Sequence, residues 1–189
     1  MIRIGLVGDI GSGKSFLAKK FGYPVFNADY EVAKLYKKEK KVFLKLKTII
    51  PKYIYSFPIN KKEITKAILA NEQNLKKIVK IVHVEIRKKM LIFLRKNKSK
   101  KAVILDIPLL LENKLNRQKD IIIFVKSQRS QIYKRLKKRK NFNQKLFNKF
   151  KKLQLPLDYK KRRSNFTIKN DFTGKSVKKD VKAILKKIL

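Results

Sequence analysis

Residues 8–15 have the types and the spacing of a phosphate-binding loop. They read Gly-Asp-Ile-Gly-Ser-Gly-Lys-Ser and match the pattern G-x-x-x-x-G-K-[ST] without a mismatch. Glycines at three of these positions allow backbone conformations closed to other residues, so several N–H groups can turn inward around an anion. We expect the phosphates of a nucleotide to contact Gly8, Asp9, Ile10, Gly11, Ser12, Gly13, Lys14, Ser15 and Phe16.

Two side chains of this loop carry its expected chemistry. Lys14 is placed to reach the β- and γ-phosphates as a point charge, and the Ser15 hydroxyl to ligate a bridging Mg²⁺. The alternative is a glycine-rich turn that matches by chance. It is disfavoured because residues 2–7 form an apolar run typical of a buried strand, and an apolar helical pattern follows the loop.

Acidic residues follow two further apolar runs. Asp29 comes shortly after residues 24–26 and is either a catalytic carboxylate or the N-cap of a helix beginning at Tyr30. Asp106 ends the run 102–105, where a carboxylate can lie near the bound metal or occupy an ordinary turn. Glu112 either binds a substrate or is simply exposed.

Basic residues and one histidine complete the candidate set. Arg129, Arg135 and Arg139 lie in a very basic segment ending near Lys140, with Arg135 and Arg139 at i and i+4 on one helical face. Such arginines suit a lid that closes over ATP phosphates, and they suit a solvated basic helix equally well. The only histidine, His83, is by itself best interpreted as a packed or surface residue, because the chain has no cysteine or second histidine for a zinc site.

The composition limits the classes of protein that are possible. The chain has 189 residues, 43% of them hydrophobic, and no cysteine, so one main domain without disulfides is expected. No apolar run is long enough to span a membrane, and we expect a cytoplasmic protein. The formal net charge is +39, but the lysines are spread along the chain, so we expect a generally basic surface and no specific nucleic-acid partner.

The pattern of elements predicts an α/β protein. Apolar runs at 2–7, 24–26, 102–106, 121–125 and 166–168 predict parallel strands, and amphipathic patterns predict helices at 14–21, from 30 onward, 72–94, 143–154, 158–164 and 177–189. Strands alternate with helices, and there is no internal repeat. We therefore expect a three-layer P-loop NTPase fold of the nucleoside-monophosphate-kinase type, with a parallel five-stranded sheet.

From end to end the chain resembles dephospho-coenzyme A kinases. Beyond the loop, the residues that carry the resemblance are Asn27-Ala28-Asp29, His83, the segment 106–112 (Asp-Ile-Pro-Leu-Leu-Leu-Glu), Gln131 with Arg135 and Arg139, Gln154 with Lys160, and Asn170. The phosphate loop alone is shared by very many proteins. The 106–112 segment and the 154–170 ending distinguish this family.

The resemblance implies transfer of the ATP γ-phosphoryl group to the ribose 3′-hydroxyl of dephospho-coenzyme A. It implies Asp29 as general base, with Lys14 and Arg139 as the other catalytic residues. It implies Arg135, Arg139 and Asn170 on the ATP side, and Asp29, His83, Asp106, Leu109 and Glu112 on the acceptor side. Mg²⁺ would be held by Ser15 and Asp106.

The resemblance also implies a division of the chain and its partners. A single kinase domain would have its core at 1–29 and 100–189, a helical acceptor-binding insertion at about 30–97 and a short lid at about 135–158. The partners would be ATP and dephospho-coenzyme A, with a monomer or weak homo-oligomer as the expected state.

The chain departs from the family pattern at a few positions. Asn27 stands where Asp is usual, Phe16 where Thr is usual and Val84 where Pro is usual, and Ser164-Asn165 replace Ala-Asp. Asn27 keeps hydrogen-bonding capacity but lacks the charge for a metal role. Two alternatives stay open at this point: a kinase of the same fold acting on a nucleoside or nucleotide, and a nucleic-acid-binding protein that uses the loop as an ATP switch.

Overall fold

The computed structural model describes residues 1–139 and 142–189, so Lys140 and part of the predicted lid lie outside the described residues. Within those ranges the chain forms five strands and nine helices. In order they are β1 (Ile2–Gly8), α1 (Lys14–Lys20), β2 (Val25–Asn27), α2 (Ala28–Lys38), α3 (Lys40–Ile49), α4 (Lys61–Ala70), α5 (Glu72–Lys96), β3 (Ala102–Asp106), β4 (Ile121–Lys126), α6 (Arg129–Lys137), α7 (Gln144–Lys152), α8 (Leu157–Arg162), β5 (Phe166–Lys169) and α9 (Lys175–Ile188).

The five strands form one parallel sheet in the order β2-β3-β1-β4-β5. The central strands are buried on both faces, which explains why they read as continuous apolar runs and not as alternating patterns. The predicted parallel five-stranded α/β fold is confirmed. Because all strands run the same way, their carboxyl ends meet at one edge, where the residues after β1, β2 and β3 converge.

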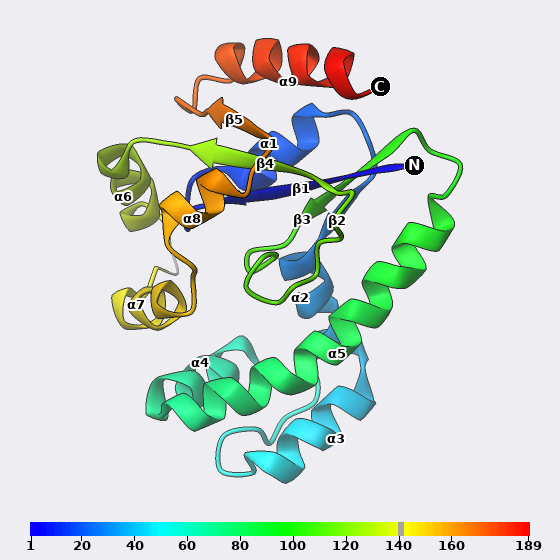
Figure 1. Ribbon diagram of the computed structural model, residues 1–189. Coiled ribbons are helices and arrows are strands. Elements are labelled where there is room, and N and C mark those ends of the chain that lie inside the picture. Colours follow the sequence, from blue (N-terminus) through cyan, green and yellow to red (C-terminus); the bar gives the residue numbers. More distant parts are fainter. Residues whose placement is uncertain (140–141) are drawn as a thin grey trace.

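Helices cover both faces of this sheet and make three layers (Figure 1). On one face α1 and α9 close an apolar core around Leu17, Val177 and Val181, against strand residues such as Ile104 and Ile123. The other face packs against residues from α2 and α5 and from the segment after β3. The sheet thus separates two cores, with the phosphate loop between them at the end of β1.

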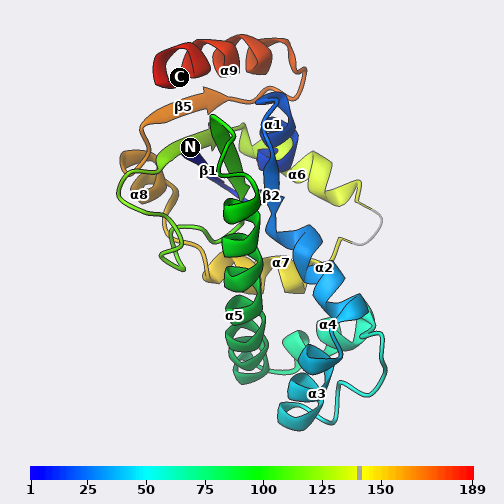
Figure 2. The same cartoon turned by 90° about the vertical axis from the view of Figure 1, so that its right-hand side faces the viewer.

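Helices α3, α4 and α5 extend beyond the sheet as a helical arm (Figure 2). The long helix α5 supports this arm because its buried residues recur every three or four positions: Leu75, Ile78, Val82, Ile86, Met90 and Leu94. Its opposite face is rich in lysine. Among the described helices, none combines the length and the apolar character needed to cross a bilayer.

The structure excludes one of the two alternatives for Asp29 and shows that one prediction about the arginines was wrong. The helix after β2 begins at Ala28 and is capped by the side chain of Asn27, so Asp29 lies in the first turn and is not the N-cap. Helix α6 ends at Lys137, so Arg139 lies beyond it and does not share a helical face with Arg135. Leu136 is the last buried residue of α6, and the like charges that follow it offer no apolar stripe to continue the helix.

A buried ion pair joins two strand starts and provides a test of this packing. Arg3 in β1 lies 2.9 Å from Asp120, with both side chains almost fully buried, and Arg3 also donates to the Leu115 carbonyl. We expect Asp120→Ala to lower the free energy of unfolding by about 3 to 5 kcal/mol, because it leaves a buried guanidinium unpaired. Urea denaturation measures this.

The matched control is Lys88→Gln, which breaks the exposed Lys88–Glu85 pair and should change the unfolding midpoint little. An equal small effect for both variants would contradict the structural role assigned to the Arg3–Asp120 pair.

Candidate phosphate-binding and catalytic site

The phosphate loop is held by side chains from two other strand ends. The Ser12 carbonyl accepts hydrogen bonds from Asn170 Nδ2 at 2.8 Å and from Ser127 Oγ at 3.0 Å. Asn170 is buried, and its Oδ1 accepts from the Phe172 backbone N–H at 3.0 Å. The residues following β4 and β5 therefore fix the conformation of the loop after β1.

Gly13 shows why this brace needs glycine in the loop. Its φ of 89° is in the left-handed region, where it serves as the N-cap of α1 without a side-chain hydrogen bond. A Cβ at this position would also collide with the Asn170 side-chain amide. Loop and brace are thus compatible only with glycine at position 13.

Lys14 folds back across its own loop. Its Nζ donates to the Asp9 carbonyl at 2.7 Å and to the Gly8 carbonyl at 3.3 Å. Burial lowers the pKa of Lys14 to about 8, the nearby Asp106 raises it, and the Lys160 ammonium lowers it further. In this structure two backbone carbonyl oxygens accept the hydrogen bonds of this ammonium group. A bound anion would instead give it an oppositely charged partner.

Asp106 is oriented by Asn27 on the neighbouring strand. The two residues are register partners in the β2–β3 ladder, and Asn27 Nδ2 donates to Asp106 Oδ2 at 2.5 Å. The Asn27 Oδ1 accepts from the Tyr30 N–H at 2.8 Å, which caps α2 and fixes which way the amide points. Asp106 is only 3% exposed, so this contact determines how its carboxylate presents itself to the site.

Asp29 lies two residues after Asn27, in the first turn of α2. Its side chain reaches solvent, yet protein surrounds it on several sides. This partial burial raises the pKa of Asp29 first, and the Asp106 carboxylate raises it further. The opposing influences on that pKa are the cations Lys14, Lys61 and Arg139. The structure thus brings two carboxylates and three cations together at the carboxyl edge of the sheet.

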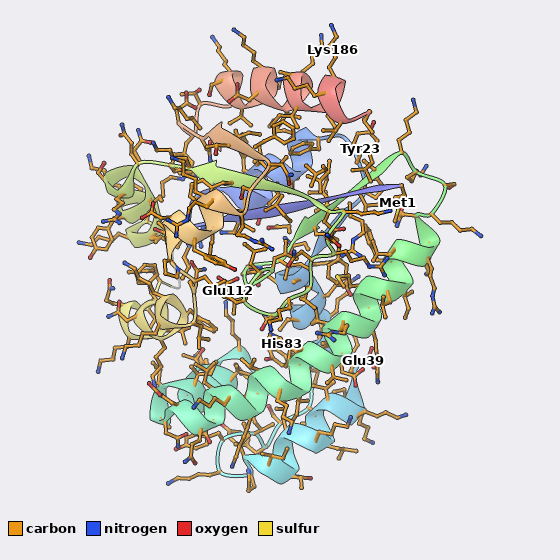
Figure 3. All side chains as sticks on the ribbon, in the orientation of Figure 1. Met1, Tyr23, Glu39, His83, Glu112 and Lys186 are labelled. Carbon is orange, nitrogen blue, oxygen red and sulfur yellow. The ribbon has the colours of Figure 1, made fainter. Side chains whose placement is uncertain are left out.

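His83 faces the segment that follows Asp106. Its Nε2 lies 3.4 Å from Asn113 Nδ2, and desolvation together with the Arg87 charge lowers the pKa of His83. Both the short contact and the lowered pKa are explained if His83 is a neutral imidazole whose Nε2 accepts a hydrogen bond from the Asn113 amide. In Figure 3 the labelled Glu112 lies on the side of the sheet that faces the helical arm, and His83 is on α5 of that arm.

The remaining predicted residues are distributed around this edge. Leu109 is half-buried in the turn after β3, whereas Arg135 and Arg139 are exposed. Arg135 stacks on the Phe172 ring at 4.4 Å, beside the loop end that Asn170 braces. Phe16 is 39% exposed, so this phenylalanine lies outside the apolar core.

Sequence reasoning missed the residues that position these groups. The functions of Asn27 as a clamp and of Ser127 as a brace depend on which strands are neighbours, which no local pattern reveals. Lys61 begins α4, far along the chain, and its charge acts on Asp29 only through the fold. The position of Asn27 two residues before Asp29 was the one available signal.

A cavity opens on the side of the phosphate loop that faces α6. It has a volume of about 660 Å³ and is lined by residues of α6, α7 and α8, with Asp9 as its contribution from the phosphate loop. Asp29, Asp106 and Lys14 do not line it. The charged edge of the sheet, and not this cavity, therefore has the chemistry of a reaction site.

Comparisons with known proteins point to one family. A family model described as dephospho-CoA kinase matches residues 2–176. A dephospho-CoA kinase from Wolbachia sp. subsp. Brugia malayi (strain TRS) is 34% identical over 187 residues, which cover 96% of this chain and 95% of that protein.

Solved structures show the same fold. A protein from Thermus thermophilus aligns with a TM-score of 0.79 at 24% identity, covering 100% of this chain and 98% of that one. A dephospho-CoA kinase from Campylobacter jejuni aligns with a TM-score of 0.65 at 19% identity, covering 98% and 96%.

The brace on the phosphate loop leads to a test. We expect Asn170→Ala to raise the dissociation constant of a non-hydrolysable ATP analogue about tenfold, because the Ser12 carbonyl loses a buried donor and the loop loosens. Isothermal titration calorimetry measures the constant. Asn170→Asp should weaken binding as well, since a carboxylate cannot donate to that carbonyl.

Thr173→Ala, three residues along the same loop and exposed, is the matched control and should bind normally. Unchanged affinity in Asn170→Ala would show that the brace does not matter for nucleotide binding.

Proposed function

The chain belongs to the dephospho-CoA kinase family, and from this premise we propose how its site carries out the reaction. The enzyme is an ATP-dependent kinase of coenzyme A biosynthesis. It transfers the γ-phosphoryl group of ATP to the 3′-hydroxyl of dephospho-CoA. The proposal rests mainly on one observation. Lys14, Asp29 and Asp106 lie close enough to influence one another's charge, next to the braced phosphate loop.

Asp29 is the proposed general base. Its carboxylate accepts the proton of the acceptor hydroxyl while the hydroxyl oxygen forms a bond to the γ-phosphorus. The bond from that phosphorus to the oxygen bridging the β- and γ-phosphates breaks, and its electron pair leaves with ADP. A raised pKa makes Asp29 a better proton acceptor than an ordinary aspartate, although positioning and electrostatics carry most of such a transfer.

Cations of the chain stabilise the charge that spreads over the transferred group. Lys14 turns from the carbonyls of its own loop to the β- and γ-phosphates, where its positive charge is more strongly attracted. Arg139, whose charge already acts on Asp29, approaches from the lid side. Arg135 and Phe172, which stack on each other, together with Asn170 border the nucleotide beyond the loop.

The residues present fit a bound Mg²⁺ ion. Ser15 offers a hydroxyl oxygen that is open to solvent, and Asp106 offers a carboxylate of which only Oδ2 is engaged. Magnesium prefers such oxygen ligands and keeps several waters and substrate phosphates in its shell, so one hydroxyl and one carboxylate suffice. When bound, the ion would neutralise phosphate charge during transfer.

We propose that the acceptor enters from the side of the helical arm, the region about 30–97. His83 as a neutral imidazole and Leu109 beside Asp106 form the wall that receives it. Helix α7 belongs to the lid. The enzyme would work in the cytoplasm as a monomer or weak homo-oligomer, which sedimentation analysis tests.

The acceptor and the base are tested together. Purified protein with ATP and Mg²⁺ should phosphorylate dephospho-CoA but not adenosine, AMP or CMP. Asp29→Asn should lower kcat about 10²- to 10⁴-fold while the KM for ATP changes little, because the base acts only in the chemical step. Lys14→Ala should abolish turnover. Chromatographic detection of coenzyme A measures the product.

Asp171→Asn is a suitable control, since Asp171 is exposed in the loop after β5. If the protein phosphorylated a nucleoside or nucleotide in preference to dephospho-CoA, the proposed role of the phosphate loop would stand but the proposed acceptor would be wrong. Wild-type kcat in Asp29→Asn would remove Asp29 as the base.

The Asn27 clamp predicts a change in metal requirement. Asn27→Ala should raise the Mg²⁺ concentration for half-maximal activity about tenfold, because Asp106 loses the donor that orients it. The variant should also lose about 1 kcal/mol of stability with its helix cap. Titration of Mn²⁺ followed by electron paramagnetic resonance gives metal affinity independently of turnover.

Asn71→Ala removes a comparable cap, that of α5, and separates the two effects. It should lower stability by a similar amount and leave the metal requirement unchanged. Equal metal titrations for Asn27→Ala and Asn71→Ala would mean that Asn27 acts only as a cap.

A further inference from the structure

Lys160 is the most completely buried charged side chain among the described residues, and the proposed reaction does not use it. It lies on α8 with 1% exposure, and its Nζ is 2.7 Å from Glu112 Oε1. Glu112 belongs to the turn after β3, and its side chain is only 9% exposed. An ion pair this deeply buried contributes little net stability compared with apolar residues of the same size. We therefore look for a functional reason for this pair.

The same pair reaches the end of helix α7. Lys160 Nζ also donates to Gln154 Oε1 at 3.2 Å, and the Leu155 N–H donates to Glu112 Oε1 at 3.1 Å. Gln154 and Leu155 follow directly after α7 and its C-cap Leu153. The segment after α7 therefore contacts the turn after β3 directly through Leu155 and indirectly through Lys160 of α8, which holds both Gln154 and Glu112.

The turn after β3 also contacts the core of the sheet and the helical arm. Leu110 packs so closely on Gly5 in the central strand that a Cβ there would collide with it. Asn113, next to Glu112, meets His83 on α5. One short segment thus touches the central strand, the acceptor-side helix and, through Glu112, the base of the lid.

We propose that Glu112, Lys160 and Gln154 form a latch that positions the lid helix α7 relative to the acceptor side. The proposal rests on the proposed function and makes Glu112 a positioning residue. Acceptor contact with the turn at 107–113 shifts Glu112, and the latch passes this shift to the base of α7. Binding of acceptor and binding of ATP under the lid thereby favour each other.

The test compares coupling between the two ligands. The ratio of the dissociation constants of an ATP analogue without and with dephospho-CoA is measured by calorimetry. The double variant Glu112→Gln/Lys160→Met removes both charges without leaving one buried and unpaired. We expect the ratio to fall by about fivefold or more towards one, while affinity for the analogue alone changes less than about twofold.

The matched control is Glu39→Gln/Lys89→Met, which removes another interhelical ion pair of 3.0 Å away from the site. It should leave the ratio unchanged. A wild-type ratio in the latch variant, at wild-type stability, would overturn the proposal.

A second readout does not depend on the acceptor. Tryptic cleavage at the lysines of α7 should be severalfold faster in the latch variant than in wild type, because the base of the helix is released. Unchanged cleavage at equal global stability would also overturn the latch. If wild-type protein fails to phosphorylate dephospho-CoA, the proposed function falls and the cleavage result alone decides on the latch.

Discussion

The site depends on one constraint: a loop of backbone N–H groups must hold an anion-binding shape that few residues can adopt. Gly13 supplies the left-handed conformation, and the Ser12 carbonyl supplies the point at which Asn170 and Ser127 fix the loop from behind. Backbone groups that face a ligand cannot also bond to one another, so support must come from outside the loop. The parallel sheet provides it, because β4 pairs with β1 and β5 pairs with β4, and all three strands end at the same edge.

Charge balance is the second requirement of this edge. Lys14 and Lys160 are cations in or near the interior, and each needs a hydrogen-bonding or oppositely charged partner. The partner of Lys14 must also be one that a phosphate can replace. Lys160 has Glu112, and Lys14 has the carbonyls of its own loop until a phosphate replaces them. The Asp106 carboxylate raises the pKa of Asp29, while Asn27 orients Asp106 without adding a third negative charge. An aspartate at position 27 would bring three carboxylates together, so asparagine here lowers the repulsion between negative charges at this edge.

The sequence predicted the architecture well because that information is local. A buried parallel strand is a continuous apolar run, and the phosphate loop is contiguous, so β1, the loop and α5 could be recognised one segment at a time. Asp29 and Asp106 could be proposed because each follows such a run. What could not be predicted depends on neighbours in space. Asn27 meets Asp106 only because β2 lies beside β3, and Asn170 reaches Ser12 across 158 positions of the chain. The end of α6 before Arg139 was missed for a different reason, since the pattern of arginines fitted a helix that had no apolar residue left to bury.

The excess of positive charge has a different distribution from the charges of the site. Most of the basic side chains lie on outward faces, as on α9, where the labelled Lys186 points away from the sheet (Figure 3). A broad positive field draws polyanions to the molecule in general and speeds their encounter with it. It cannot select among them, because every nucleotide carries phosphates. Selection requires groups whose positions are fixed to within a fraction of an ångström, and these are the buried ones: the braced loop, the clamped Asp106 and the paired Lys160. The surface charge can therefore vary widely while the enzyme keeps its reaction, provided that each buried charge keeps its partner.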